Sequence, residues 1–237
     1  MKYIILIISI FLIPLTSQAA NSEALKFIDL MAYSQKPESG MMYQTDSIIP
    51  IGWSRSGYFA YIKEAPVEGR GGVIYTYVIF DSINDKIVWS TEHDIIDGAE
   101  DSFEKSYKQF KPTFLKALQK FKIEQGEGTK FEKFPYKSLE GSSYTIELKT
   151  QKRLSKNPQD FFLGDIKSLK VNVLKDRTIK KKVYSKENLG AFSYWSAGYF
   201  KSPFEERILI VVGEEKYGFE GTEGKFIFIG CDLKRGF

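Results

Sequence analysis

The sequence predicts a mainly β fold of the α+β class, with antiparallel sheets and one long amphipathic helix. Aromatic residues make up 15% of the chain, and aromatic and β-branched side chains fit the pleated surface of a sheet. Several apolar runs have strand length and are separated by turn-forming residues, as at Val73–Phe80. A single stretch, between Asp97 and Ile123, carries helical periodicity instead.

The segment Pro50–Asp81 is expected to form the centre of the sheet structure. Arg55-Ser56-Gly57 predicts a tight turn, because Gly57 can adopt a positive φ without steric cost. Tyr58–Ile62 follows as a strand, and Val73–Phe80 is apolar enough for a central strand covered on both faces. A turn at Ser82–Lys86 then leads into a short returning strand at Ile87–Trp89.

The predicted helix has an aromatic stripe whose members are spaced by three or four residues. The stripe consists of Phe103, Tyr107, Phe110, Phe114, Leu118 and Phe121. Pro112 lies within it and removes one backbone hydrogen bond, so we expect one helix bent at Lys111. The stripe is expected to pack on the sheet, with a groove for a partner as the alternative.

The second half of the chain predicts further strands around a loop-like segment. Residues 125–142 are rich in Gly, Lys and Glu and form a candidate internal boundary. Further strands are predicted at Ser143–Lys149, Leu169–Val173, Ile179–Tyr184, Arg207–Val212 and Lys225–Cys231. Turns are predicted at Lys175–Arg177, Lys186–Gly190 and Gly213–Gly224, and residues 24–33 fit a strand or a short helix.

The first 19 residues have the pattern of a secretory signal peptide. Lys2 is followed by an apolar run from Tyr3 to Leu15, and Ser17-Gln18-Ala19 places small residues where a signal peptidase cleaves. We therefore expect export to the periplasm or beyond, with residues 20–237 as a single domain. An uncleaved N-terminal anchor is the alternative, and the lack of a nearby cysteine argues against a lipid-modified N-terminus.

Two tryptophan-serine segments give the chain a local resemblance to known proteins. Trp53-Ser54-Arg55-Ser56-Gly57-Tyr58-Phe59 resembles the Trp-Ser-x-x-Gly hairpin of TolB-like β-propeller blades, and Trp195-Ser196-Ala197-Gly198-Tyr199-Phe200 is a shorter copy. A propeller needs at least about four blades. The resemblance therefore implies two related hairpin units on a common core. The whole chain is also similar to uncharacterised secreted bacterial families, or domains of unknown function, and this likeness implies no activity.

No catalytic, metal or cofactor motif is recognisable. The single histidine, His93, is expected in a surface loop, and the single cysteine, Cys231, is expected as an inert thiol in a buried strand. Acidic residues cluster at Glu92, Asp94, Asp97, Glu100, Asp101 and Glu104. Acids at a helix N-terminus are explained by the helix dipole, so we predict no cofactor and no catalytic residue.

Charge is distributed unevenly along the chain. The segment Lys149–Lys186 holds 12 basic and 3 acidic residues, whereas the net charge of the whole chain is only +4. Arg177, Lys180, Lys181 and Lys182 are the candidate binding residues, for an anionic envelope component; nucleic acid is not expected. The alternative is a solvated hairpin whose lysines protect an edge strand.

Three functional hypotheses follow. The first is a non-enzymatic exported protein that binds a partner in the bacterial envelope. The second is an envelope hydrolase that uses carboxylates near Glu92–Asp101. The third is a structural subunit that docks through the helix stripe or the basic hairpin.

Overall fold

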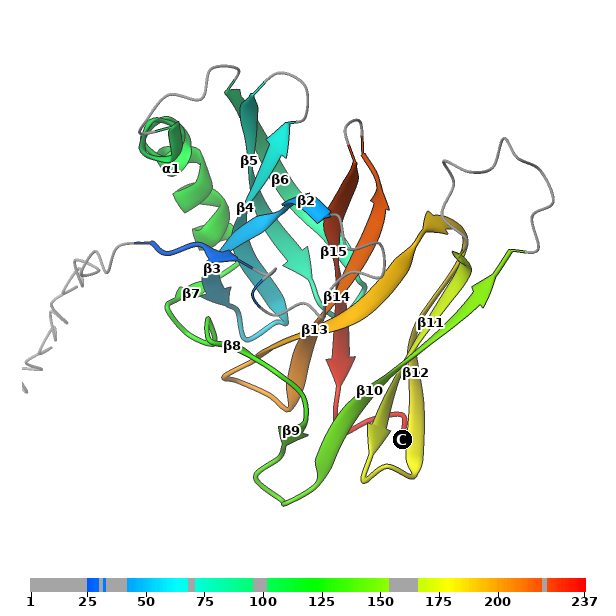
Figure 1. Ribbon diagram of the computed structural model, residues 1–237. Coiled ribbons are helices and arrows are strands. Elements are labelled where there is room, and N and C mark those ends of the chain that lie inside the picture. The colour runs from blue at the N-terminus through cyan, green and yellow to red at the C-terminus, as the bar shows by residue number, and fades with distance from the viewer. Residues whose placement is uncertain are drawn as a thin grey trace, which may run out of the picture.

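The fold is mainly β, with antiparallel sheets and one helix, as the sequence predicts (Figure 1). A computed structural model describes residues 25–29, 32, 42–67, 71–95, 102–153, 166–218 and 221–237. The expected signal peptide at residues 1–19 lies outside these described residues.

Three sheets contain the described strands. Sheet A has the order β1 (Ile28–Asp29), β3 (Ser47–Trp53), β4 (Tyr58–Val67), β5 (Gly72–Asp81) and β6 (Lys86–Ile95), and β7 (Glu124–Gln125) also pairs with β3. Sheet B has the order β2 (Met42–Thr45), β15 (Thr222–Asp232), β14 (Arg207–Tyr217), β13 (Ser193–Lys201) and β8 (Phe131–Glu132). Sheet C has the order β12 (Ile179–Ala191), β11 (Ile166–Lys175), β10 (Ser143–Lys152) and β9 (Tyr136–Lys137).

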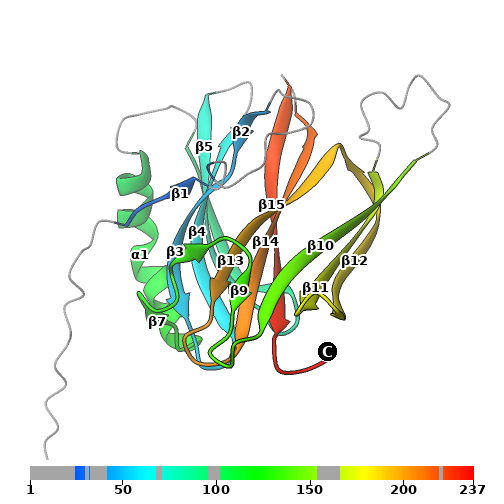
Figure 2. The same ribbon diagram turned by 60° about the horizontal axis from the view of Figure 1, so that its bottom comes forward.

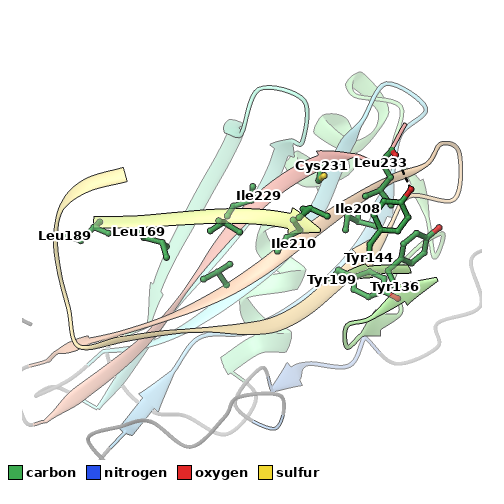
Figure 3. Close-up of a cluster of buried hydrophobic side chains, with 13 residues drawn as sticks. Tyr136, Tyr144, Leu169, Leu189, Tyr199, Ile208, Ile210, Ile229, Cys231 and Leu233 are labelled. Atoms are coloured by element: carbon green, nitrogen blue, oxygen red, sulfur yellow. Dashed lines mark hydrogen bonds between the residues drawn. The ribbon is translucent and has the colours of Figure 1, made fainter. Parts of the chain in front are cut away.

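The sheets and the helix α1 (Ser102–Lys120) stack in the order α1, sheet A, sheet B, sheet C (Figures 1 and 2). A separate cluster of buried apolar side chains fills each of the three interfaces. Sheet B is therefore covered on both faces, which explains why the first nine residues of β14 are all buried. Figure 3 shows the cluster between sheets B and C, where the Tyr144 hydroxyl donates to the Leu233 carbonyl at 3.3 Å.

The aromatic stripe of α1 packs on sheet A, which confirms the helix prediction. Phe114 is buried and its ring stacks on Trp89 at 5.8 Å between centroids. Two tyrosines of β5 also reach the helix: the hydroxyls of Tyr75 and Ser102 are 2.8 Å apart, and those of Tyr77 and Ser106 are 2.9 Å apart. The helix continues through Pro112.

The segment at residues 125–142, predicted as a loop, holds short strands that contact all three sheets. β7 pairs with β3 in sheet A, β8 pairs with β13 in sheet B, and β9 pairs with β10 in sheet C. Two-residue strands carry no periodicity, so the sequence gives no signal for them.

The second tryptophan-serine segment forms no hairpin, contrary to our expectation. Trp195 and Gly198 both lie within the single strand β13, and the turn to β14 follows at residues 202–206. Ala197 alone separates Ser196 from Gly198, and Gly198 (φ +155°) adjoins a β-bulge instead of closing a turn. Both tryptophans nevertheless belong to the same buried cluster, between sheets A and B.

Two predicted turns are also corrected. Residues 186–190 continue strand β12, because a bulge in the β11–β12 ladder lets the pairing extend to Ala191. The predicted connection from Gly213 to Gly224 is mostly strand, and β14 pairs with β15 up to Tyr217 and Thr222. Neighbouring strands on both sides stabilise these extensions, and local sequence does not reveal such neighbours.

Five turns between sequential strands gather at one end of the molecule, which we call the turn end (Figure 2). It comprises residues 54–57, 82–85, 138–142, 176–178 and 202–206. Hydrogen bonds connect these turns within and between layers: the backbone N–H of Ser82 donates to the Gly57 carbonyl at 3.1 Å within sheet A, and Arg207 Nη1 of sheet B donates to the Ser82 carbonyl at 3.3 Å. The Ser143 N–H likewise donates to Asp176 Oδ1 at 2.8 Å.

Candidate ligand-binding surface

Sheet C is the outermost layer, and the face that points away from sheet B is a candidate binding surface. Side chains alternate along a strand, so Ile146, Leu148, Val171 and Val173 point into the cluster shared with sheet B. The residues between them point outward, and we call this surface the open face of sheet C. Its polar and charged members are Thr145, Glu147, Lys149, Gln151, Ser168, Lys170, Asn172, Lys180, Lys182, Ser185 and Glu187.

Cations outnumber acids on this face. Lys149 lies directly opposite Lys170 in the β10–β11 ladder, and Lys182 lies opposite Asn172 in the β11–β12 ladder. Neighbouring strands are about 4.8 Å apart, so these ammonium groups form a two-dimensional array rather than a single stripe. Glu187 is the second acid and lies farther along β12, opposite Ser168.

Glu147 is held at the centre of the array. It forms an ion pair with Lys180, lies 3.5 Å from Lys149 Nζ through Oε1, and accepts a hydrogen bond from Asn172 Nδ2 at 3.0 Å. The hydrogen bond from Lys180 lowers the pKa of Glu147, and the same contact raises the pKa of Lys180. Both groups therefore stay charged over the neutral range, and Lys170 and Lys182 are exposed to solvent.

The four candidate residues named from sequence do not form one site. Lys180 and Lys182 lie on the open face, whereas Lys181 points toward the opposite face. Lys181 Nζ donates to the carbonyls of Asp232 and Arg235, both at 2.6 Å, and lies over the Phe237 ring. Lys181 thus fastens the C-terminal segment. Arg177 lies in the β11–β12 turn, with a positive φ of 62°.

Lys149 and Lys170 belong to the face but were not singled out from sequence. The alternation in Ser143–Lys149 assigns Lys149 to the same side as Glu147. Only the pairing register places Lys170 beside it. Aligning the predicted strands Ser143–Lys149 and Leu169–Val173 as an antiparallel pair would have placed Lys170 near Lys149.

The acidic candidates are dispersed in the part of the chain that the structure describes. Glu92 and Asp94 are exposed on β6, Glu104 is exposed in the first turn of α1, and Asp97, Glu100 and Asp101 lie outside the described residues. Among the described residues, no three His, Cys, Asp or Glu side chains gather closely enough to hold a metal ion.

The histidine and the cysteine occupy structural positions. His93 lies in strand β6 rather than in a loop, because β5 pairs with this segment up to Ile95, and its ring contacts Phe110 of α1 at 5.1 Å. Cys231 is buried in β15, as predicted, and burial raises the pKa of its thiol to about 11. Such a thiol stays protonated at neutral pH and is a poor nucleophile.

A hollow of about 470 Å³ opens at the turn end. Its lining includes Leu139, Lys201, Phe204 and Lys234. Beside it, the Tyr136 hydroxyl donates to Glu206 Oε2 at 2.8 Å, and Lys201 Nζ lies 3.7 Å from Glu206 Oε1. Burial raises the pKa of Tyr136, so this phenol is neutral and acts as a hydrogen-bond donor.

Comparison with protein-family models, with curated proteins and with solved structures finds no match for this chain. Within the described ranges, no helix combines the length and apolar character needed to cross a bilayer.

Proposed function

We propose that this protein is a non-enzymatic, exported component of the bacterial envelope that binds an anionic polymer on the open face of sheet C. One observation carries the proposal. The other sheet faces are covered by α1 or by a neighbouring sheet, whereas no described helix or sheet packs on this face, which carries four lysines against two acids. The N-terminal signal-peptide pattern supports export.

The geometry suits a repeating anion better than a single small ligand. The face is a layer of strands, and its lysines are spread over all three long strands of sheet C. Lysine ammonium groups act as point charges without the fixed fork of arginine, so they favour many weak contacts along a polymer over one oriented contact. Affinity from such contacts should fall steeply with salt.

The test is polymer binding by the exported protein and by two charge-matched variants. Inorganic polyphosphate and polygalacturonate serve as phosphate and carboxylate probes. The test variant K149Q/K170Q/K182Q removes three lysines from the open face but retains the Lys180–Glu147 pair. The control variant K105Q/K108Q/K116Q removes three exposed lysines from α1, in the opposite layer.

We expect the sheet C variant to bind at least one probe about tenfold more weakly, since each surface contact is worth about 0.5 kcal/mol. Its affinity should also depend less on salt. The helix variant should bind as the unmodified protein does. Equal losses in both variants, or no binding of either probe, would refute the proposal.

A further inference from the structure

Exposed apolar side chains gather at the turn end. Among the described residues, five large hydrophobic side chains are exposed, and four of them lie in or next to its turns: Ile83 (56%), Ile87 (56%), Leu139 (92%) and Ile179 (48%). The fifth, Leu25, is 37% exposed and precedes β1, which pairs with the start of β3 at the other end. Isolated exposed hydrophobics are ordinary, but their collection at one end indicates an interaction surface.

Leu139 is presented by a well-formed turn. The Ser138 N–H donates to the Ser142 carbonyl at 2.9 Å, and the Ser142 N–H donates to Ser138 Oγ at 3.1 Å. The Gly141 N–H closes the turn on the Ser138 carbonyl at 3.0 Å. These bonds fix the backbone on both sides of Leu139, so the turn holds this side chain in water instead of folding it inward.

The cations around this turn are available to a ligand. Lys137, Arg177 and Lys234 are exposed and form no ion pair with any described residue. Nearby acids are already engaged: Asp176 accepts from the Ser143 N–H at 2.8 Å, and Asp232 accepts from the Lys234 N–H at 2.8 Å. Glu140, next to Leu139, is an exposed acid that remains.

The hollow at the turn end joins both features. Leu139, Pro203 and Phe204 supply its apolar lining, and Lys234 supplies an ammonium group with no ion pair to a described residue. Its other charged groups are already paired: Lys201 with Glu206, and Glu205 with Arg207. An opening with apolar walls and one unpaired ammonium group suits a molecule that carries a phosphate next to an acyl chain.

We propose that the turn end docks on the surface of an anionic lipid bilayer. Leu139 and Ile83 enter the boundary between headgroups and acyl chains, and Lys137, Arg177 and Lys234 contact lipid phosphates. Apolar insertion combined with cationic attraction is the physical basis of reversible attachment to such a surface. This interaction goes beyond the proposed function, because it uses a different surface from the open face of sheet C.

The test is co-sedimentation with lipid vesicles, using protein exported with its own leader and purified after processing. The vesicles are pure phosphatidylcholine or phosphatidylcholine mixed with phosphatidylglycerol. The variant L139S removes the most exposed apolar side chain without changing charge, and L25S is the matched control at the other end. The variant K137Q/R177Q/K234Q removes the three cations.

We expect binding to the mixed vesicles and little binding to pure phosphatidylcholine. L139S should weaken binding about tenfold, since a buried leucine side chain accounts for about one order of magnitude in partitioning. The triple variant should weaken it by a similar factor, and L25S should have no effect. Circular dichroism should show all variants folded, because every substituted side chain is exposed.

Three outcomes would overturn the proposal: no binding to anionic vesicles, equal losses for L139S and L25S, or loss only in the sheet C variant K149Q/K170Q/K182Q. The last outcome would assign lipid to the open face of sheet C. A protein that binds vesicles through Leu139 but neither polymer would instead refute the proposed function alone.

Discussion

Trp53 and Trp195 show how one dipeptide, Trp-Ser, serves two structural purposes. Trp53 ends strand β3, is fully buried, and donates from Nε1 to the Gly128 carbonyl at 3.1 Å. Trp195 lies in the middle of β13 and is also buried, but its Nε1 has no hydrogen-bond partner among the described residues. Both rings lie in the buried cluster between sheets A and B, one on each sheet.

The following serines differ in the same way. Ser54 Oγ accepts hydrogen bonds from the N–H groups of Ser56 and Tyr58, at 3.2 and 3.1 Å, and so closes the β3–β4 turn. Ser196 is paired within strand β13, opposite Val212 and next to the β-bulge. The two residues between Ser54 and Gly57 make room for a turn, whereas Ala197 alone does not. Similar residues therefore yield a hairpin in one sheet and a bulged strand in the other.

The largest expected effect concerns the glycine that faces each tryptophan ring. An added Cβ at Gly213 would lie 2.0 Å from Trp195 Cε2, so G213A should lower the free energy of unfolding by about 3 kcal/mol. G128A should cost as much, because its Cβ would lie 2.5 Å from the Lys201 carbonyl oxygen and Gly128 has a φ of +66°. Urea denaturation measures both.

The two glycines should differ in rescue. W195L should recover about 2 kcal/mol of the loss in G213A, because the three atoms nearest to the added Cβ all belong to the Trp195 ring. W53L should not rescue G128A, because the backbone clash and the positive φ remain. If the stability losses of the single variants simply add in both double variants, the clash between Gly213 and Trp195 described here is wrong.

A smaller difference is expected from the indole N–H groups. W53F leaves the Gly128 carbonyl without its donor, whereas W195F removes a buried N–H that has no partner. Both variants lose ring volume, so we expect W53F to be about 1 to 2 kcal/mol more destabilising than W195F by urea denaturation. The reverse order would mean that Trp195 has a partner outside the described residues.

The serines should give a still smaller difference. S54A deprives two backbone N–H groups of their acceptor and should cost about 1 kcal/mol. S196A should change stability by less than about 0.5 kcal/mol, because its side chain forms no hydrogen bond with a described residue. Thermal unfolding of both variants measures this difference. Equal losses of stability would show that Ser54 does not stabilise its turn more than Ser196 stabilises its strand.

The smallest effect is the pH dependence of the turn that supports Gly57. Burial opposes ionisation of Asp81, but hydrogen bonds from Asn84 and from the backbone N–H groups of Ile83 and Asn84 outweigh it and lower its pKa. A lowered folded-state pKa stabilises the fold above the unfolded-state pKa, near 4, and this contribution is lost as pH falls through the folded-state pKa.

We therefore expect D81N to be less stable than the unmodified protein at neutral pH, with the gap closing below about pH 4. Denaturation curves across this range measure the gap. A gap that does not change with pH would mean that the turn relies on hydrogen bonds alone and not on the charge of Asp81.

Features with a local pattern could be predicted from the amino-acid sequence. The stripe from Phe103 to Phe121 identified α1, because a period of 3.6 residues is visible in one stretch of chain. The apolar run Val73–Phe80 identified β5, and Arg55-Ser56-Gly57 identified the first hairpin turn. The buried, inert state of Cys231 also followed from its neighbours.

Which distant segments pair with one another could not be predicted in this way. The pairing of β7, β8 and β9 with three different sheets, the register that sets Lys149 against Lys170, and the turning of Lys181 toward the C-terminal segment all join residues that are far apart in the chain. The same holds for the open face of sheet C and for the gathering of exposed apolar residues at the turn end. Strand pairing depends on long-range backbone hydrogen bonds and shared burial, which leave no local pattern in the sequence.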